Sequence, residues 1–276
     1  MGLLSASKIP IRHGAQQNGI RAACALARDI LLKICAEVHA GVTTGAIDRM
    51  AAAEMKARGC KSAFLGYRKF PGHICISVNE EVVHGIGGPR VISDGDVVKI
   101  DVGIEHNGWI GDNALTVPVG NVAQETLHLL AATEEALHVA IRHARDGWML
   151  GDLCASVEEH VIQYGYSVVR EFVGHGVGRK LHEEPQVPNY GVRGERPRLK
   201  AGMTLAIEPM VNMGTPKTRI LSDNWTVITT DRRPSAHYEH VALITEGEPE
   251  VLTLRKRMFP KGVGDLTPLP ISALAA

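Results

Sequence analysis

Long apolar runs, paired cysteines and an excess of one charge are all missing from this sequence of 276 residues. Without a run of 18 apolar residues we expect no membrane-spanning helix, and the start "MGLLSASKIP" has too short an apolar core for a signal peptide. The five cysteines are odd in number and form no Cys-x-x-Cys, which favours reduced thiols in the cytoplasm. Thirty acidic and thirty basic residues cancel, so nothing indicates a membrane partner or specific nucleic-acid readout.

Aromatic residues are scarce at 4%, whereas thirteen histidines are present, which favours metal binding or acid–base chemistry. Hydrophobic residues make up 45% of the chain, as in ordinary globular proteins with a substantial core. The segment "FVGHGVGRKLHEEP", residues 172–185, holds His175 and His182 among several glycines, which permit close backbone approach. This segment is a candidate active-site loop, and a plain surface loop is the alternative.

An internal repeat organises the chain. "AGVTTGAIDRMAAAEMKARGC" (40–60) resembles "DGWMLGDLCASVEEHVIQYGY" (146–166), with three glycines and an apolar i, i+4, i+8 stripe in register. The stripe and the trailing glycine predict an amphipathic helix in each segment. Each helix follows another helical pattern, at about 15–38 and 124–145.

A second match lies downstream, where "DGDVVKID" (94–101) resembles "AGMTLAIE" (201–208). Gly95 then corresponds to Gly202, and Asp101 to Glu208. The chain therefore reads as two α+β halves, each with a helix pair and antiparallel strands, related by a pseudo-twofold axis. A site between the halves would receive a carboxylate from the end of each equivalent strand.

The stretch "VVKIDVGIEHNGWIGDNALTV" (97–117) predicts a β-hairpin, because Asn107-Gly108 is a strong turn signal between β-rich runs. Loops of two or four residues place Asp101 and Asp112 on the same face, directly opposite or diagonal. A three-residue loop places them on opposite faces. Two carboxylates on one face are either exposed acids or, because they repel strongly, a cation site.

Further donors come from the second half: His175, Glu208 at the end of "MTLAIE", and Glu239 in "HYEHVALIT". One imidazole among four carboxylates suits Mn²⁺, Fe²⁺, Co²⁺ or Zn²⁺ better than a thiolate-rich structural site does. Four carboxylates exceed the needs of one ion, which favours two ions that share carboxylates.

The ordered motifs "CISVNEEVVHGIG", "VKIDVGIEHNGWIGD", "EFVGHGVGRKLHEEPQVPNYG", "LAIEPMV" and "DNWTVITTDRRPSAHYEH" resemble the type I methionine aminopeptidases over about residues 12–254. The resemblance implies an α+β pita-bread fold around a dinuclear metal site. It implies that two divalent ions (Co, Mn, Fe or Zn) are held by Asp101, Asp112, His175, Glu208 and Glu239. It also implies that His84 and His182 contact the substrate, and that Glu208 moves a proton to the leaving amine.

The same resemblance implies removal of the N-terminal methionine from nascent proteins and peptides whose second residue is small. It also implies transient ribosome contact, and we expect a monomer. The family's substrate pocket maps onto Phe64, Tyr67, Phe70, Cys75, His84, Leu181, His182 and Trp225. Many members have Cys in place of Phe64 and Phe in place of Leu181, which we interpret as a compensating swap of aromatic bulk.

We expect a flexible N-terminal arm (1–11), one catalytic domain (12–254, with halves of about 12–121 and 122–254) and a flexible tail (255–276).

Ser5-Ala6-Ser7-Lys8 fits Ser-x-x-Lys but lacks partner motifs. A serine hydrolase lacks its Gly-x-Ser-x-Gly, and a zincin fails because Gln186 stands where a second His is needed. The remaining alternatives are a proline-directed peptidase of the same fold and a non-catalytic pita-bread protein, which would have lost ligands.

Overall fold

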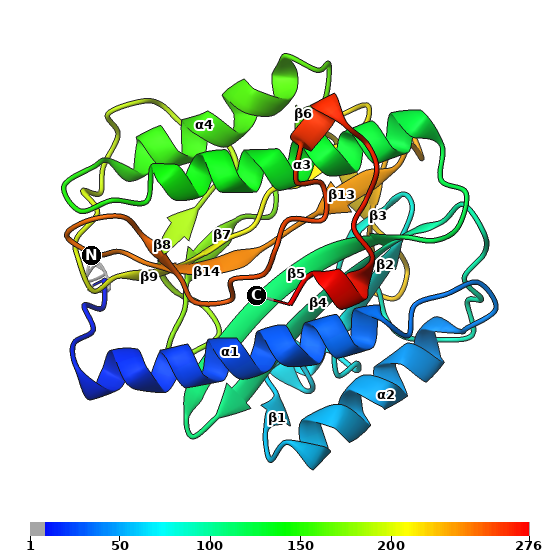
Figure 1. The fold of residues 1–276 in the computed structure, drawn as a ribbon, viewed down its shortest axis with the longest axis horizontal. Helices are drawn as coiled ribbons and strands as arrows, with labels where there is room; N and C mark the ends of the chain where they lie inside the picture. The colour runs from blue at the N-terminus through cyan, green and yellow to red at the C-terminus, as the bar shows by residue number, and fades with distance from the viewer. Residues whose placement is uncertain (1–8, 276) are drawn as a thin grey trace, which may run out of the picture.

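The computed structural model describes residues 9–275, and Figure 1 shows long helices on either side of a set of antiparallel strands. Segments of the first half comprise α1 (Ala15–Cys35), α2 (Thr44–Ala57), β1 (Lys61–Ser62), the 3-10 turn η1 (Tyr67–Lys69), β2 (Cys75–Val78), β3 (Glu81–Val83), β4 (Val97–His106) and β5 (Trp109–Pro118). No helix among the described residues is long and apolar enough to cross a membrane.

The second half repeats the order of two helices followed by strands. Its segments are α3 (Gln124–Arg142), α4 (Leu150–Ile162), β6 (Ser167–Val168), β7 (Gly174–Gly176), β8 (Glu183–Val187), β9 (Thr204–Ile207), β10 (Met210–Asn212), β11 (Thr218–Ile220), β12 (Val227–Thr229), β13 (Ser235–His237), β14 (His240–Leu243) and β15 (Glu250–Val251). The C-terminal segment that follows adds the 3-10 turns η2 (Gly262–Gly264) and η3 (Ile271–Ala273).

Local structure bears out the internal repeat. The predicted apolar stripes of α2 and α4 are buried, from Ile47 to Met55 and from Leu153 to Val161. Gly95 and Gly202 precede equivalent strands with φ of 89° and 94°, a left-handed conformation that favours glycine. The two halves therefore use the same turn to enter the strands that carry Asp101 and Glu208.

Within residues 9–275 the strands form four antiparallel sheets, in the orders β1-β4-β2 (with β5 on β4), β13-β10-β6, β11-β12-β3 and β15-β14-β9-β7-β8. Helix α1 packs on β5 and β4, and α3 packs on α4 and β13. The halves meet where the Glu239 N–H donates to the Ala114 carbonyl of β5 (3.0 Å) and the Thr116 hydroxyl donates to the His237 carbonyl (2.7 Å). This seam positions the candidate site.

The β4–β5 hairpin has the two-residue loop that the sequence allowed. His106 pairs with Trp109, and both loop residues are left-handed, Asn107 at φ 52° and Gly108 at φ 72°. In this register Gly103 is opposite Asp112 and Asp101 is opposite Ala114. Asp101 and Asp112 therefore lie diagonally on one face of the hairpin, as predicted.

The C-terminal segment 255–275 differs from the flexible tail expected from its composition. Met258, Phe259 and Leu274 are almost completely buried, and both N–H groups of residues 258 and 259 donate to the carboxylate of Glu134 at 2.8 Å. Its turns η2 and η3 contact α3 and α1, so the segment spans from the second half to the first (Figure 1). Burial of these apolar anchors offsets the conformational entropy that favours disorder.

At the other end, residues 9–11 are partly buried, and the Arg12 N–H donates to the Gly202 carbonyl (2.8 Å). The Arg12 guanidinium is buried and pairs with the Glu183 carboxylate. The part of the expected arm that the structure describes therefore packs on the domain. Ser5-Ala6-Ser7-Lys8 lies outside the described residues.

Replacing Glu134 with Gln should detach the C-terminal segment. Only one amide oxygen would remain for two N–H donors, and the new NH₂ would face one of them. Hydrogen bonds to a buried charged group stabilise by about 1.5–3 kcal/mol each, so we expect the free energy of unfolding to fall by about 2–4 kcal/mol. Calorimetric melting at fixed metal concentration measures the loss, with exposed Glu125→Gln on the same helix as the control. Equal melting temperatures for the two variants would mean that the Glu134 carboxylate does not hold the segment.

Candidate active site

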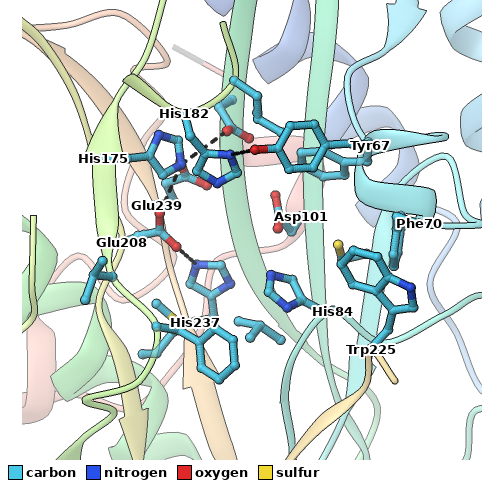
Figure 2. A pocket seen from close by; sticks show the side chains of 18 of the residues that line it. Tyr67, Phe70, His84, Asp101, His175, His182, Glu208, Trp225, His237 and Glu239 are labelled. Atoms are coloured by element: carbon cyan, nitrogen blue, oxygen red, sulfur yellow. Dashed lines mark hydrogen bonds and ion pairs between the residues drawn. The ribbon is translucent and has the colours of Figure 1, made fainter. Parts of the chain in front are cut away.

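A cavity of about 340 Å³ opens at the seam between the two halves (Figure 2). Its lining includes every site residue predicted from the sequence: Phe64, Tyr67, Phe70, Cys75, His84, Asp101, Asp112, His175, Leu181, His182, Glu208, Trp225 and Glu239. The structure therefore brings the candidate metal ligands and the candidate substrate-binding residues into one space.

Three carboxylates form the first group of donors in this cavity. Asp101 on β4, Asp112 on β5 and Glu239 between β13 and β14 each offer an oxygen atom, and these atoms lie within 4.8 Å of one another. One oxygen of each is buried with no hydrogen-bond partner among the described residues. Buried carboxylate oxygens normally have partners, and three such atoms without one, side by side, fit a cation that would pair with all of them.

A second group shares Asp112 with the first. His175 on β7 places its Nε2 3.4 Å from Glu208 Oε1 and 3.9 Å from Asp112 Oδ2. Its Nδ1 lies 3.0 Å from the Gly176 carbonyl, which accepts a hydrogen bond from the protonated Nδ1. This bond leaves the lone pair on Nε2, facing the carboxylates, as a metal-binding imidazole requires.

The electrostatics of the group fit a divalent cation. Burial raises the pKa of Asp101, Asp112, Glu208 and Glu239 well above their usual values, and repulsion from neighbouring carboxylates raises each pKa further. Burial lowers the pKa of His175 to about 3, with a further contribution from His182, so this imidazole is neutral. A neutral imidazole beside oxygen donors that repel one another is a suitable donor set for a transition-metal ion.

The walls of the cavity are aromatic and include further imidazoles. Phe70 and Trp225 meet edge to face with ring centroids 5.1 Å apart, and His84 meets Trp225 at 6.1 Å. His84 and Trp225 lie across the cavity from Glu208 in Figure 2. The Tyr67 hydroxyl lies 2.8 Å from His182 Nδ1, which fixes the orientation of that imidazole.

Both predicted substrate-contacting histidines are electrically neutral near pH 7. Burial, assisted by the neighbouring His182, lowers the pKa of His84 to about 4. Burial also lowers the pKa of His182, assisted by Arg68. His84 has a left-handed backbone with φ of 60°, an uncommon conformation for a residue other than glycine that is concentrated at functional sites.

Sequence reasoning missed His237, which lies at the base of the cavity. Its Nε2 is 3.6 Å from Glu208 Oε2 and has no hydrogen-bond partner among the described residues. Its position two residues before Glu239 in a β-rich run was the available signal, because alternate residues of a strand share a face. The other lining residues not predicted are Arg68, Val83, Glu171, Phe172, Val173 and Met210.

The class of protein follows from the family that this chain matches. Residues 18–246 match metallopeptidase family M24, and the chain belongs to this family. The α+β pita-bread fold is thereby confirmed, and the chain is a metal-dependent hydrolase of peptides.

Within the family, the chain is 47% identical over 216 residues to "Methionine aminopeptidase 1" of Bacillus subtilis, covering 78% of this chain and 87% of that protein. The crystal structure of a methionine aminopeptidase from Thermotoga maritima superposes with a TM-score of 0.87 at 39% identity, covering 89% of this chain and 99% of that one. A prolidase from Pyrococcus furiosus is more distant, with a TM-score of 0.73 and 25% identity, and the match covers 88% of this chain and 65% of that one.

Proposed function

We propose that this chain removes the N-terminal methionine from peptides and proteins whose second residue is small. The observation that carries the proposal is one cavity with a carboxylate cluster on one side and an aromatic wall on the other. A cavity of about 340 Å³ accommodates one side chain and its scissile amide rather than a long segment of substrate. The identity to methionine aminopeptidases, at 47% against 25% for the prolidase, favours methionine over proline-directed cleavage.

The residues that would hold two divalent ions are Asp101, Asp112, His175, Glu208 and Glu239, with Asp112 common to both donor groups. Co, Mn, Fe and Zn all suit such a donor set, and availability in the cell selects among them. Bound divalent ions would lower the pKa of a water to near neutrality and polarise the scissile carbonyl.

The chain's own side chains supply the remaining steps. Neutral His182, oriented by Tyr67, can donate a hydrogen bond to the carbonyl oxygen as negative charge develops there. His84, which is neutral and lines the same cavity, can donate a second hydrogen bond to the substrate near the scissile amide. Glu208 would take a proton from the attacking water and pass it to the leaving amine, and its position between His175 and His237 supports this role.

Hydrolysis of Met-Ala, Leu-Ala and Ala-Pro peptides by the metal-loaded protein tests the assignment. We expect kcat/KM for Met-Ala to exceed that for Leu-Ala by about 10–200-fold, because a branched side chain misfits a pocket shaped for an unbranched thioether. Faster cleavage of Ala-Pro than Met-Ala would favour the proline-directed alternative. No cleavage of any peptide would favour a binding protein.

His182→Ala should lower kcat/KM for Met-Ala by about 10²–10³-fold, the usual effect of removing one donor to a developing oxyanion. The bound metal should stay unchanged, because neither donor group contains His182. Kinetics combined with elemental analysis measure both quantities. Metal loss in this variant would assign His182 to the ligand set instead.

We further propose that the protein acts in the cytoplasm as a monomer on emerging N-termini, in transient contact with the ribosome. The resemblance to bacterial methionine aminopeptidases supports this setting. Ribosome co-sedimentation and sedimentation velocity test the contact and the monomer.

A further inference from the structure

The aromatic ring of Phe64, which lines the cavity, lies against Gly103 of β4. A Cβ added at Gly103 would lie 2.2 Å from Cε1 and 2.6 Å from Cζ of that ring. Carbon atoms pack at about 3.5–4.0 Å, so any side chain at position 103 would push the ring by about 1.3–1.8 Å. Gly103 does not have a positive φ, and so it is space rather than backbone conformation that requires glycine here.

The backbone behind the ring is held in place, which limits where the ring can go. The Ala63 N–H donates to the Gly103 carbonyl (2.9 Å), and the Ser62 hydroxyl accepts from the Phe64 N–H (3.0 Å) while it donates to the His73 carbonyl (2.7 Å). Strand β1 is paired with β4 at Ser62 and Ile104. A displaced Phe64 ring would therefore move by rotation about its side-chain torsions, while its backbone stays in place.

The contact lies beside the carboxylates. Gly103 is two residues along β4 from Asp101, on the same face, and pairs directly with Asp112 on β5. Phe64 is 8% exposed and lines the same cavity as those two carboxylates. The ring against Gly103 thus forms part of the wall of the cavity that holds the donors on β4 and β5.

We propose that Gly103 and Phe64 form a matched pair that sets the width of the pocket for the N-terminal side chain, with Gly103 as a specificity-determining residue. The missing side chain at 103 lets a full aromatic ring pack closely against β4, and the ring in this place leaves a slot for an unbranched chain such as a thioether. This inference rests on the proposed aminopeptidase function. It adds Gly103 as the partner of Phe64, beside the swap with Leu181 expected from the sequence.

Gly103→Ala should narrow the slot by pushing the ring into it. We expect KM for Met-Ala and the Kd for free L-methionine, measured by calorimetry on metal-loaded protein, to rise by about tenfold or more. The bound metal should stay the same and kcat should change less than KM. In a Phe64→Leu background the same Gly103→Ala change should raise KM less than about threefold, because coupled neighbours are not additive. Gly247→Ala is the control, since a Cβ there meets no heavy atom within 4 Å.

Equal rises of KM in both backgrounds, or no rise in either, would overturn the pairing. If Gly103→Ala loses metal or fails to fold, Phe64→Leu alone decides the question. That variant should raise the rate on Phe-Ala relative to Met-Ala by about tenfold, and an unchanged ratio would overturn the proposal. If the unmodified protein cleaves no peptide, the proposed function fails. The Kd values for L-methionine of the unmodified protein, the two single variants and the double variant still decide whether Gly103 and Phe64 act together on the pocket or independently.

Discussion

The Glu208→Gln variant is expected to lose about 10²–10⁴-fold in kcat/KM for Met-Ala, the range for removal of a general acid–base group, together with much of its bound metal. The carboxylate is the closest partner of His175 Nε2 at 3.4 Å and lies 3.6 Å from His237 on its other side. A neutral amide of the same shape can neither accept a proton nor offset the charge of a cation. The value of kcat/KM and the metal content should therefore fall together in this variant.

Glu184→Gln is the matched control, because Glu184 is exposed and close in the chain to His182. Glu183 is unsuitable for comparison because its carboxylate pairs with buried Arg12 and accepts from the Arg179 N–H. Similar losses in the Glu208 and Glu184 variants would remove Glu208 from the assigned machinery.

The Asp112→Asn variant should melt at a higher temperature than the unmodified protein without metal, and at a lower temperature than the unmodified protein with metal. Without metal, Asp112 is a buried carboxylate that raises the pKa of Glu208 and Glu239 by repulsion, so its replacement by a neutral amide should raise the melting temperature. With metal, the unmodified protein gains stability by binding the ion. The variant gains little, because it binds metal more weakly without the carboxylate that both donor groups share.

Differential scanning calorimetry with and without a divalent ion measures the crossing of melting temperatures. One kcal/mol corresponds to about 2–4 °C for a domain of this size, so the shifts are measurable. Exposed Glu246→Gln controls for the change in net charge. The same order of melting temperatures in both conditions would contradict a cation at Asp112.

Much of the fold could be predicted because it depends on local signals. The Asn107-Gly108 turn and the β-rich runs around it predicted the hairpin, and a loop of two or four residues, unlike one of three, would place Asp101 and Asp112 on one face. Counting along the chain could not choose between loops of two, three and four residues. The structure chose two, because both residues adopt the left-handed conformation that matches the twist of the strands.

The rest of the site depends on contacts between distant parts of the chain. His237 faces Glu208 because β13 pairs with β10, where His237 is opposite Met210, two residues after Glu208. Phe64 fits only because Gly103, on another strand, has no side chain. The Pro-rich C-terminal segment was expected to be flexible, yet its two N–H donors meet a carboxylate 124 and 125 residues earlier. Composition carries no information about such partners.

The central claim is that the cluster of Asp101, Asp112, His175, Glu208 and Glu239 makes this chain a metal-dependent methionine aminopeptidase. The most direct test strips the protein of metal with a chelator, confirms the loss by elemental analysis, and assays Met-Ala hydrolysis before and after addition of Co, Mn, Fe or Zn singly. The account predicts no hydrolysis by the stripped protein and recovery with at least one ion. Full hydrolysis by protein shown to be free of metal would contradict it.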